Sequence, residues 1–210
     1  MEVVTTHHNA DFDGLAAMVA VRKLSPDVQL VLSGGAQETV HAFLSAHDLN
    51  LTKLKDLDLA QVSKLILVDT HEPDRIGPFK QCWLDPNVEV QVFDHHKADS
   101  GATETPVPGK SIRQVIEAVG ATVTMLIERV RDAGVSVTPL EATVLALGLY
   151  DETGSFTYSS TTPRDLQAAA FLLGAGADLK LVMQTLHRPL DPNIVALLND
   201  LLQHLSLIHI

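Results

Sequence analysis

The sequence predicts an α/β fold: a doubly wound, mainly parallel sheet flanked by helices, followed by a helical C-terminal part. Two observations lead to this fold class. Short apolar runs rich in Val, Ile and Leu alternate with helical patterns over the first 116 residues, and helical patterns alone continue from residue 121. Hydrophobic residues make up 46% of the 210-residue chain, which is ample for a buried core.

The first half of the chain supplies the strands. Apolar runs predict strands at residues 3–6, 28–32, 64–68, 88–93 and 112–116. Helices are expected at residues 14–23, where Ser25-Pro26 follows as an end signal, and at 36–47. Between the second strand and its helix, Ser33-Gly34-Gly35 is expected to form a loop at the same sheet edge, and residues 49–59 are a connector.

The second half is predicted to be helical. A helix at 121–133 carries apolar residues at core spacing, and Gly134 suits its C-terminal end. Thr138-Pro139-Leu140-Glu141 is a capping box with proline in the first turn, and it starts the helix that ends near residue 151. The same start recurs at Thr162-Pro163-Arg164-Asp165. Further helices are expected to about residue 173, at 178–187 and at 191–204.

Clusters of Asp, Glu and His end four of these elements. The first cluster, His7 to Asp13, separates the first strand from the first helix. Asp69 ends a second apolar strand, Asp94-His95-His96 ends another, and Asp151-Glu152-Thr153-Gly154 ends a helix. The carboxyl ends of strands lie along one edge of an open α/β sheet, which is where ligands bind. We therefore expect the four clusters to meet at one place.

A site with this composition should hold metal. His7, Asp11 and Asp13 fall within seven positions, and the alternative is that Asp11 or Asp13 only caps the helix while the histidines are solvated. Recurrence of the pattern favours a site. So many close carboxylates raise one another's pKa unless a cation neutralises them. Imidazole and carboxylate without thiolate suit Mn²⁺ or Mg²⁺, and Zn²⁺ or Fe²⁺ also fits; the ligands suffice for two ions.

These motifs resemble those of the DHH phosphoesterase superfamily, whose name is the triplet seen here as Asp94-His95-His96. The family's first motif, His-x-Asn-x-Asp-x-Asp, corresponds to residues 7–13. Its second is the strand-ending Asp69, and its fourth is an acid followed by Thr153-Gly154. The resemblance covers the chain to about residue 190. It is greatest to DHH domains fused to CBS domains and a tRNA nucleotidyltransferase (polyA polymerase-like) module.

The resemblance implies a role for each residue. One ion would be bound by His7, Asp11 and Asp69, and the other by Asp13, Asp69, His95 and the acid of the fourth motif. His96 would contact the scissile phosphate, and Asp94 would orient its neighbouring histidine. His71, in the loop after the second motif, is expected to support a ligand or to face solvent.

The fourth motif departs from the family pattern. The family usually has Asp directly before Thr-Gly, whereas here that position is Glu152 and Asp151 precedes it. Adjacent helical residues point about 100° apart, so one of the two is expected to reach the ions. Register favours Glu152, chemistry allows Asp151, and both are candidate ligands.

Charge and cysteine content narrow the class of protein. A formal charge of −11 argues against nonspecific binding of duplex DNA, which needs a basic stripe. Nucleotides or short single-stranded nucleic acids remain suitable substrates because metal and a few basic groups can hold a phosphate. The single cysteine, Cys82, cannot form an internal disulfide, no leader precedes the first strand, and no apolar run approaches a membrane span. A cytoplasmic location without membrane contact is expected.

The predicted function is that of a two-ion, Mn²⁺- or Mg²⁺-dependent phosphoesterase that hydrolyses phosphodiester or phosphomonoester bonds of nucleotides or short RNA or DNA. An alternative is a weakly catalytic module that binds metal and nucleotide within a tRNA nucleotidyltransferase-type RNA-processing protein. A third is an inorganic pyrophosphatase, whose first motif is similar.

Three regions are expected along the chain. Residues 1–190 should form the DHH domain, and 191–204 a linker helix towards a second, DHHA1-type domain that this sequence lacks. Residues 205–210, Leu-Ser-Leu-Ile-His-Ile, match the translation of a common transposase adapter and are predicted to be derived from it. The C-terminal domains of the same chain would then be partners of this domain.

Overall fold

The computed structural model describes residues 1–96, 110, 112–187 and 192–205. Its strands are β1 (Glu2–Thr5), β2 (Asn9–Ala10), β3 (Gln29–Leu30), β4 (Gly35–Ala36), β5 (Lys64–Val68), β6 (Glu89–Asp94) and β7 (Ile112–Ile116). Its α-helices are α1 (Phe12–Leu24), α2 (Glu38–Ala46), α3 (Lys80–Leu84), α4 (Thr122–Asp132), α5 (Pro139–Glu152), α6 (Pro163–Gly174), α7 (Leu179–Leu186) and α8 (Pro192–Leu205). Short 3-10 turns are η1 (Leu54–Asp56), η2 (Leu59–Gln61), η3 (Pro73–Arg75) and η4 (Gly77–Phe79).

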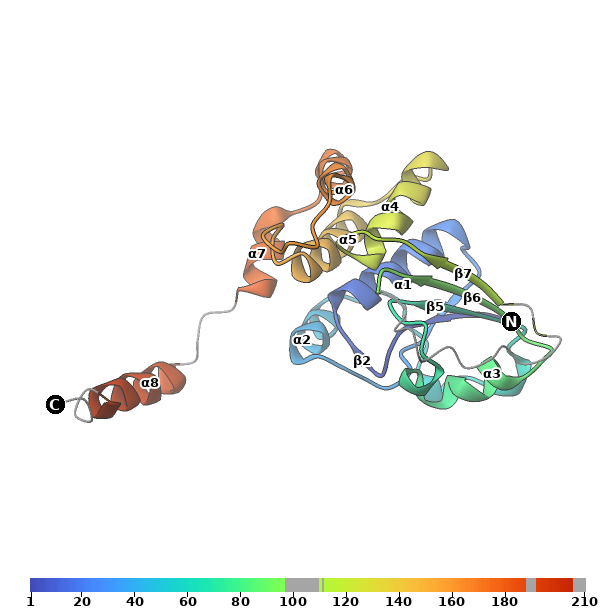
Figure 1. The fold of residues 1–210 in the computed structure, drawn as a ribbon, viewed down its shortest axis with the longest axis horizontal. Coiled ribbons are helices and arrows are strands. Elements are labelled where there is room, and N and C mark those ends of the chain that lie inside the picture. Colours follow the sequence, from blue (N-terminus) through green and yellow to red (C-terminus); the bar gives the residue numbers. More distant parts are fainter. Residues whose placement is uncertain (97–109, 111, 188–191, 206–210) are drawn as a thin grey trace.

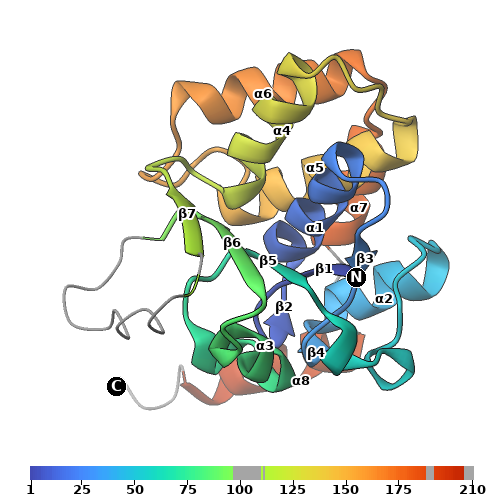
Figure 2. The ribbon, with the colours of Figure 1, turned by 90° about the vertical axis from the view of Figure 1, so that its right-hand side faces the viewer.

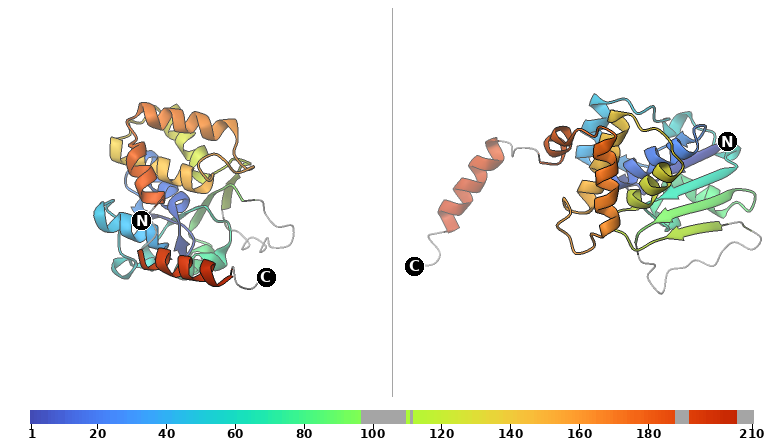
Figure 3. Two further views of the ribbon diagram at one scale, coloured as in Figure 1. Left: turned by 90° about the vertical axis from the view of Figure 1, so that its left-hand side faces the viewer. Right: turned by 90° about the horizontal axis from the view of Figure 1, so that it is seen from above.

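The main sheet has five parallel strands within the described residues, in the order β3-β1-β5-β6-β7, which are labelled in Figure 2. Figure 3 shows the same sheet and its helices from two further sides. Numbered along the chain this order is 2-1-3-4-5, a doubly wound arrangement whose direction of winding changes between β1 and β5. The predicted fold class is therefore confirmed. Because every neighbouring pair is parallel, the carboxyl ends of all five strands lie at one edge, and the first three motifs follow β1, β5 and β6 there.

Each face of the sheet carries its own core. Val4 and Ile66 point to the layer of α1, α4 and α5, whereas Val3 and Leu65 point to the layer of α3 and the 3-10 turns. Alternation of side chains along a strand produces this division. Figure 1 shows α1, α4 and α5 on one side of the sheet and α3 on the other. The sheet is thus buried on both faces, which leaves its edges and strand ends for function.

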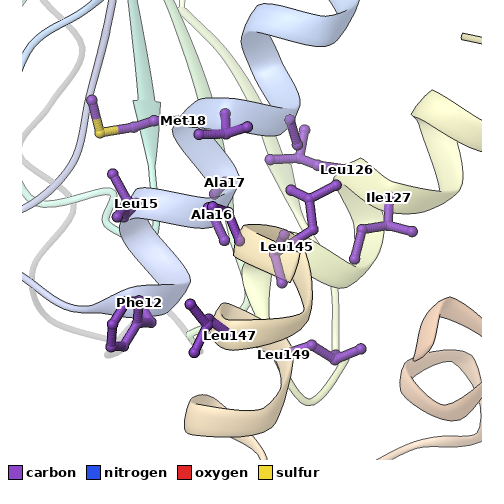
Figure 4. Packing of buried hydrophobic residues seen from close by; sticks show 14 of the residues in the cluster. Phe12, Leu15, Ala16, Ala17, Met18, Leu126, Ile127, Leu145, Leu147 and Leu149 are labelled. Carbon is purple, nitrogen blue, oxygen red and sulfur yellow. The ribbon is translucent and has the colours of Figure 1, made fainter. Parts of the chain in front are cut away.

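Helices α1 and α5 approach each other very closely (Figure 4). Ala16 and Ala17 of α1 and Leu145 of α5 are fully buried in this contact. A Cβ atom added at Gly148 would lie 2.6 Å from the Cβ of Ala16 and 2.7 Å from the carbonyl oxygen of Phe12. The absence of a side chain at Gly148 therefore lets α5 bring its C-terminal end beside the N-terminal end of α1.

Gly148→Ala is expected to lower the free energy of unfolding. Overpacking costs about 1–3 kcal/mol, which exceeds the roughly 1 kcal/mol that alanine gains in helix propensity. Gly174→Ala in α6 is the matched control, because nothing lies within 4 Å of the added Cβ there, and it should be neutral or stabilising. Urea unfolding of both variants measures the difference. Equal stability of the two would contradict the close packing at Gly148.

The second strand and the helix after it are shorter than the sequence predicts. β3 covers Gln29–Leu30 of the expected 28–32, and α2 begins at Glu38 instead of residue 36. The chain leaves the main sheet because the Ser33 hydroxyl donates to the Thr6 carbonyl oxygen (2.7 Å) and Gly35–Ala36 pairs with Asn9–Ala10 in a separate two-stranded ladder. The expected loop at 33–35 is therefore partly strand β4, and its pairing with Asn9–Ala10 fixes one side of the first motif.

The C-terminal helices follow the predictions closely. Both capping boxes are present, at Thr138 with Glu141 and at Thr162 with Asp165. Helix α8 matches the helix predicted at 191–204, and it extends away from the remainder of the fold (Figure 1). The adapter-derived stretch remains a prediction, and its residues 206–210 lie outside the described residues. Within the described chain, every helix is too short or too polar to cross a membrane.

Candidate functional site

The first motif forms the turn from β1 into α1. Asp11 caps α1, since its Oδ1 accepts a hydrogen bond from the Gly14 backbone N–H (3.0 Å), while its Oδ2 lies 3.3 Å from His7 Nε2. Gly14 makes the tight turn possible, because a Cβ there would lie 2.4 Å from the Thr6 hydroxyl oxygen. The sequence left two roles open for Asp11, as a helix cap or as a member of the site. In the structure Asp11 has both positions at once. His8 instead points outward, with Nδ1 against the Arg75 carbonyl oxygen.

Asp69 lies at the centre of the cluster. It follows β5 with a left-handed backbone (φ 60°), a conformation that costs roughly 1–2 kcal/mol but is tolerated by Asp. One carboxylate oxygen lies 3.4 Å from His7 Nε2 and the other 3.7 Å from His95 Nε2. The Thr122 hydroxyl donates to this second oxygen (2.9 Å). The strained turn thus aims one buried carboxylate between two histidines from different strands.

His95 presents an unpaired nitrogen to three carboxylates. Its Nδ1 must carry the proton, because it contacts the Val119 carbonyl oxygen (3.2 Å), which can only accept. Nε2 is buried without a hydrogen-bond partner among the described residues. It lies 3.5 Å from Glu152, 3.7 Å from Asp69 and 4.0 Å from Asp13. A lone pair at Nε2 and the three carboxylates would repel one another unless positive charge, from a bound cation or a proton, lies among them.

Asp13 is held by the start of α4. Its side chain is fully buried, and its two oxygens accept hydrogen bonds from the backbone N–H groups of Thr122 (2.7 Å) and Val123 (2.9 Å). The N–H groups at a helix N-terminus have no partner within the helix, and they favour a negative charge at this place. Asp13 is thereby fixed beside His95 by a helix that begins more than a hundred residues later in the chain.

Asp94 orients two histidines at the rim of the cluster. Its Oδ1 lies 2.8 Å from His96 Nδ1, and its Oδ2 lies 2.5 Å from His71 Nδ1. These contacts hold the pKa of Asp94 below its ordinary value in spite of burial. The histidine that Asp94 orients is therefore His96, together with His71, whereas the ring of His95 is positioned by Val119. His96 remains 46% exposed, so its ring faces the open side of the site.

Of the two acids in the fourth motif, Glu152 reaches the cluster. Its Oε1 lies 3.5 Å from His95 Nε2. Asp151 faces the start of α1 instead, where its carboxylate meets the Phe12 backbone N–H and the charge of Asp11. Burial and that charge raise the pKa of Asp151. The 100° turn between neighbouring helical residues separates the two side chains as the sequence predicts.

Crowding of carboxylates shifts several pKa values. Burial, followed by the charges of Asp69 and Glu152, raises the pKa of Asp13 well above its ordinary value. Burial and Asp69 raise the pKa of Glu152 to about 7. Burial alone would lower the pKa of His7, but Asp11 and Asp69 together raise it to about 9. The cluster therefore favours positive charge. In the absence of a metal ion, bound protons supply that charge.

Stability of the metal-free chain should fall as pH rises from about 4.5 to about 9. The folded-state pKa values of Glu152, about 7 against an ordinary 4.5, and His7, about 9 against 6.5, both lie above those of the unfolded chain. Folding then binds protons, and stability is lost as they leave. Melting temperatures in EDTA across this range test it. Saturating Mn²⁺ should remove the trend, and a metal-free stability that rises with pH would contradict it.

The donor set fits divalent cations. Among the residues that the structure describes, two groups have ligand atoms within 4.8 Å of one another: His7 with Asp11 and Asp69, and Asp69 with His95 and His96. Asp69 belongs to both, and Asp13 and Glu152 lie beside the second. The unpartnered His95 nitrogen and the raised carboxyl pKa values are what removal of a cation from such a site would leave.

The segment 119–123 is the part of the site that sequence reasoning missed. Val119, Thr122 and Val123 contact the cluster through a carbonyl oxygen, a hydroxyl and two backbone N–H groups. The available signal was the start of a helix close behind the strand that ends at Ile116. Three of these four contacts are made by backbone groups, whose partners cannot be read from residue type, so that signal could not identify the role of the segment.

Comparisons with known proteins bear on the family of the chain. Residues 2–149 match the model for the DHH family, N-terminal domain. The A-adding tRNA nucleotidyltransferase of Geobacter sulfurreducens is 42% identical over 208 residues, which are 98% of this chain but 23% of that protein. The probable manganese-dependent inorganic pyrophosphatase of Deinococcus radiodurans is 32% identical over 176 residues, 82% of this chain and 53% of that protein.

Solved structures show the same fold. An exopolyphosphatase-related protein from Bacteroides fragilis superposes with a TM-score of 0.75 at 14% identity, covering 96% of this chain and 60% of that one. This chain spans about a quarter of the length of the nucleotidyltransferase and about half that of the pyrophosphatase. The match over residues 2–149 and the high identity to the nucleotidyltransferase lead to one conclusion: the chain belongs to the DHH family and carries its N-terminal domain.

Proposed function

We propose that this chain is a phosphoesterase domain that uses two divalent cations, Mn²⁺ or Mg²⁺, to hydrolyse phosphoester bonds of nucleotides or short RNA. The observation that carries the proposal is the buried His95 Nε2 without a partner among the described residues, directed at three carboxylates. The arrangement is stable once a cation lies among these groups. The pyrophosphatase relative, whose name includes manganese dependence, supports the choice of ion.

The donors would divide between two ions, with Asp69 belonging to both sets. His7, Asp11 and Asp69 would hold one, and Asp13, Asp69, His95 and Glu152 the other. Bound ions would supply Lewis-acid chemistry, lowering the pKa of a coordinated water and offsetting charge on the phosphoryl oxygens. Asp151 is set aside as a ligand because it faces α1.

His96 is positioned to bind the substrate phosphate. Asp94 raises the pKa of His96 by its hydrogen bond, against the effect of burial, and Asp69 adds to the rise. A protonated imidazole can donate a charge-assisted hydrogen bond to a phosphoryl oxygen. Because Asp94 also holds His71, two rings at the rim are fixed by one carboxylate, and His96 needs little reorganisation when a phosphate arrives.

A second candidate is a weakly catalytic module that binds metal and nucleotide within an RNA-processing protein. It is favoured by the 42% identity to an A-adding tRNA nucleotidyltransferase over 98% of this chain, and by Glu152 in place of the family's usual Asp. A third, inorganic pyrophosphatase, is favoured by the relative from Deinococcus radiodurans. The C-terminal domains of a longer chain are proposed partners of the domain in all three cases.

The test combines Mn²⁺ calorimetry with hydrolysis assays on three substrates: a short 5′-labelled oligoribonucleotide, a nucleoside 3′,5′-bisphosphate and inorganic pyrophosphate. We expect binding of two ions and Mn²⁺-dependent release of product from one or both nucleotide substrates. Turnover of pyrophosphate alone would favour the third candidate. Binding of Mn²⁺ without turnover of any substrate would favour the second. A chain that binds no divalent ion would exclude the proposed function.

A further inference from the structure

A short segment at the start of α4 reaches three members of the cluster at once. The Val119 carbonyl oxygen accepts from His95, the Thr122 hydroxyl donates to Asp69, and the Thr122 and Val123 N–H groups donate to Asp13. These groups lie within five consecutive residues. A small shift of this segment would therefore change the positions of His95, Asp69 and Asp13 together.

The carboxylate of Asp165 holds the segment at residues 119–124 by hydrogen bonds. This carboxylate is fully buried at the first turn of α6. It accepts hydrogen bonds from the Gly120 backbone N–H (3.0 and 3.1 Å) and from the Thr124 hydroxyl (2.5 Å). Gly120 directly follows Val119, and Gly120 and Thr124 lie on either side of Thr122 and Val123. Its Oδ2 also accepts from the backbone N–H (2.6 Å) and hydroxyl (2.7 Å) of Thr162. One carboxylate thus ties the segment to α6.

Gly120 lets this junction close. A Cβ added there would lie 2.6 Å from Asp165 Oδ2 and 2.9 Å from the Thr153 side chain. Thr153 is fully buried and directly follows Glu152. The segment is therefore packed against the fourth motif as well as hydrogen-bonded to α6, so its position also bears on Glu152.

We propose that Asp165 is a positioning residue for the metal cluster, acting through residues 119–124. Its role as the capping-box acid of α6 uses only the bonds to Thr162. Helix capping alone requires neither full burial nor the bonds to Gly120 and Thr124. A buried carboxylate with donors on two sides is costly to disturb, because each lost donor leaves charge uncompensated. The segment consequently has one well-defined position, and with it the three cluster residues.

The inference rests on the proposed cation site, and a matched pair of substitutions tests it. Thr124→Val removes the hydroxyl bond on the segment side of Asp165, and Thr162→Val removes the one on the helix side. Both variants lose one hydrogen bond to the same carboxylate and should melt at lower temperature than the wild-type chain. Asp165→Asn is a third single variant. Thr124→Val and Asp165→Asn should each weaken Mn²⁺ binding by about 10–100-fold, the loss expected when an outer partner of a metal ligand is removed. Thr162→Val should leave Mn²⁺ affinity unchanged.

A second measurement does not depend on metal. In the metal-free folded chain, the Nδ1–H of His95 should give a protected imidazole proton resonance, because it donates to the Val119 carbonyl oxygen. Thr124→Val and Asp165→Asn should expose this proton to exchange, whereas Thr162→Val should leave it protected. If the wild-type chain shows the resonance but binds no Mn²⁺, the proposed function fails and the positioning role is judged on the resonance alone.

The outcomes separate a positioning role from a purely structural one. If all three variants lose thermal stability but keep wild-type Mn²⁺ affinity and the protected His95 proton at a temperature where they are folded, Asp165 serves only the fold and the proposal is overturned. Equal losses of affinity in Thr124→Val and Thr162→Val would overturn it as well, because the effect would then not run through the segment.

Discussion

Asp69→Asn should abolish Mn²⁺-dependent turnover, with a loss on the order of 1,000-fold or more, the scale seen when a group that acts in the transition state is removed. Asp69 is the one residue common to both donor groups, with its oxygens 3.4 Å from His7 and 3.7 Å from His95. The amide keeps the shape and one acceptor oxygen but removes the charge that both ions would share. Initial rates at saturating Mn²⁺ measure the effect.

The same substitution should raise the melting temperature of the metal-free chain. The charge of Asp69 raises the pKa of Asp13 and of Glu152, which means that it repels both in the absence of a cation. Asp27→Asn is the control: Asp27 is an exposed acid in the turn after α1, at the far end of that helix from the site. The control should keep both activity and stability. An Asp69→Asn chain that still turns over at more than about a tenth of the wild-type rate would refute a shared ligand.

Glu152→Gln should weaken Mn²⁺ binding by at least about 10–100-fold, since loss of a direct ligand costs no less than loss of its supporting partners. Glu152 lies 3.5 Å from the unpaired nitrogen of His95 and brings its charge to the side of the site where Asp13 and Asp69 meet. Isothermal titration of Mn²⁺ into the variant and the wild-type chain measures this loss.

Asp151→Asn is the matched control for Glu152→Gln. The two acids are neighbours on α5, and each substitution removes one negative charge. Asp151 faces the Phe12 N–H, so its loss should change Mn²⁺ affinity by less than about threefold, through its screened charge alone. A larger loss in Asp151→Asn than in Glu152→Gln would mean that the fourth motif uses its first acid.

Much of the fold could be read from local patterns. The ends of β1, β5 and β6 were predictable because each apolar run stops at an Asp or shortly before a His. The starts of α5 and α6 were predictable from the capping boxes at Thr138 and Thr162. The order of strands was less accessible, because pairing depends on contacts distant in sequence. β3 was predicted too long since the hydrogen bond from Ser33 to Thr6, which turns the chain out of the sheet, is tertiary.

The side chains of the candidate site were predictable from the sequence, but the residues that hold them in place were not. His7, Asp11, Asp13, Asp69, Asp94 and His95 are chemically conspicuous, whereas the choice between Asp151 and Glu152 depended on how α5 is rotated against α1. Asp165 was visible only as a member of a capping box. Its bonds to Gly120 and Thr124 join α6 to the start of α4, and nothing in the local sequence of either element specifies that contact.

The two donor groups are separated in the time of synthesis as well as in sequence. All members of the first group, His7, Asp11 and Asp69, have been synthesised once residue 69 is added. The group around His95 lacks a member until Glu152 is added. At about 5–20 residues per second the interval between residues 69 and 152 lasts roughly 4–17 s. An ion captured early would hold β1 against β5, its parallel neighbour, while α5 is still untranslated. Ribosome-bound nascent chains of increasing length should therefore gain Mn²⁺ affinity in two steps, and a single step would mean that the first group does not form without the second.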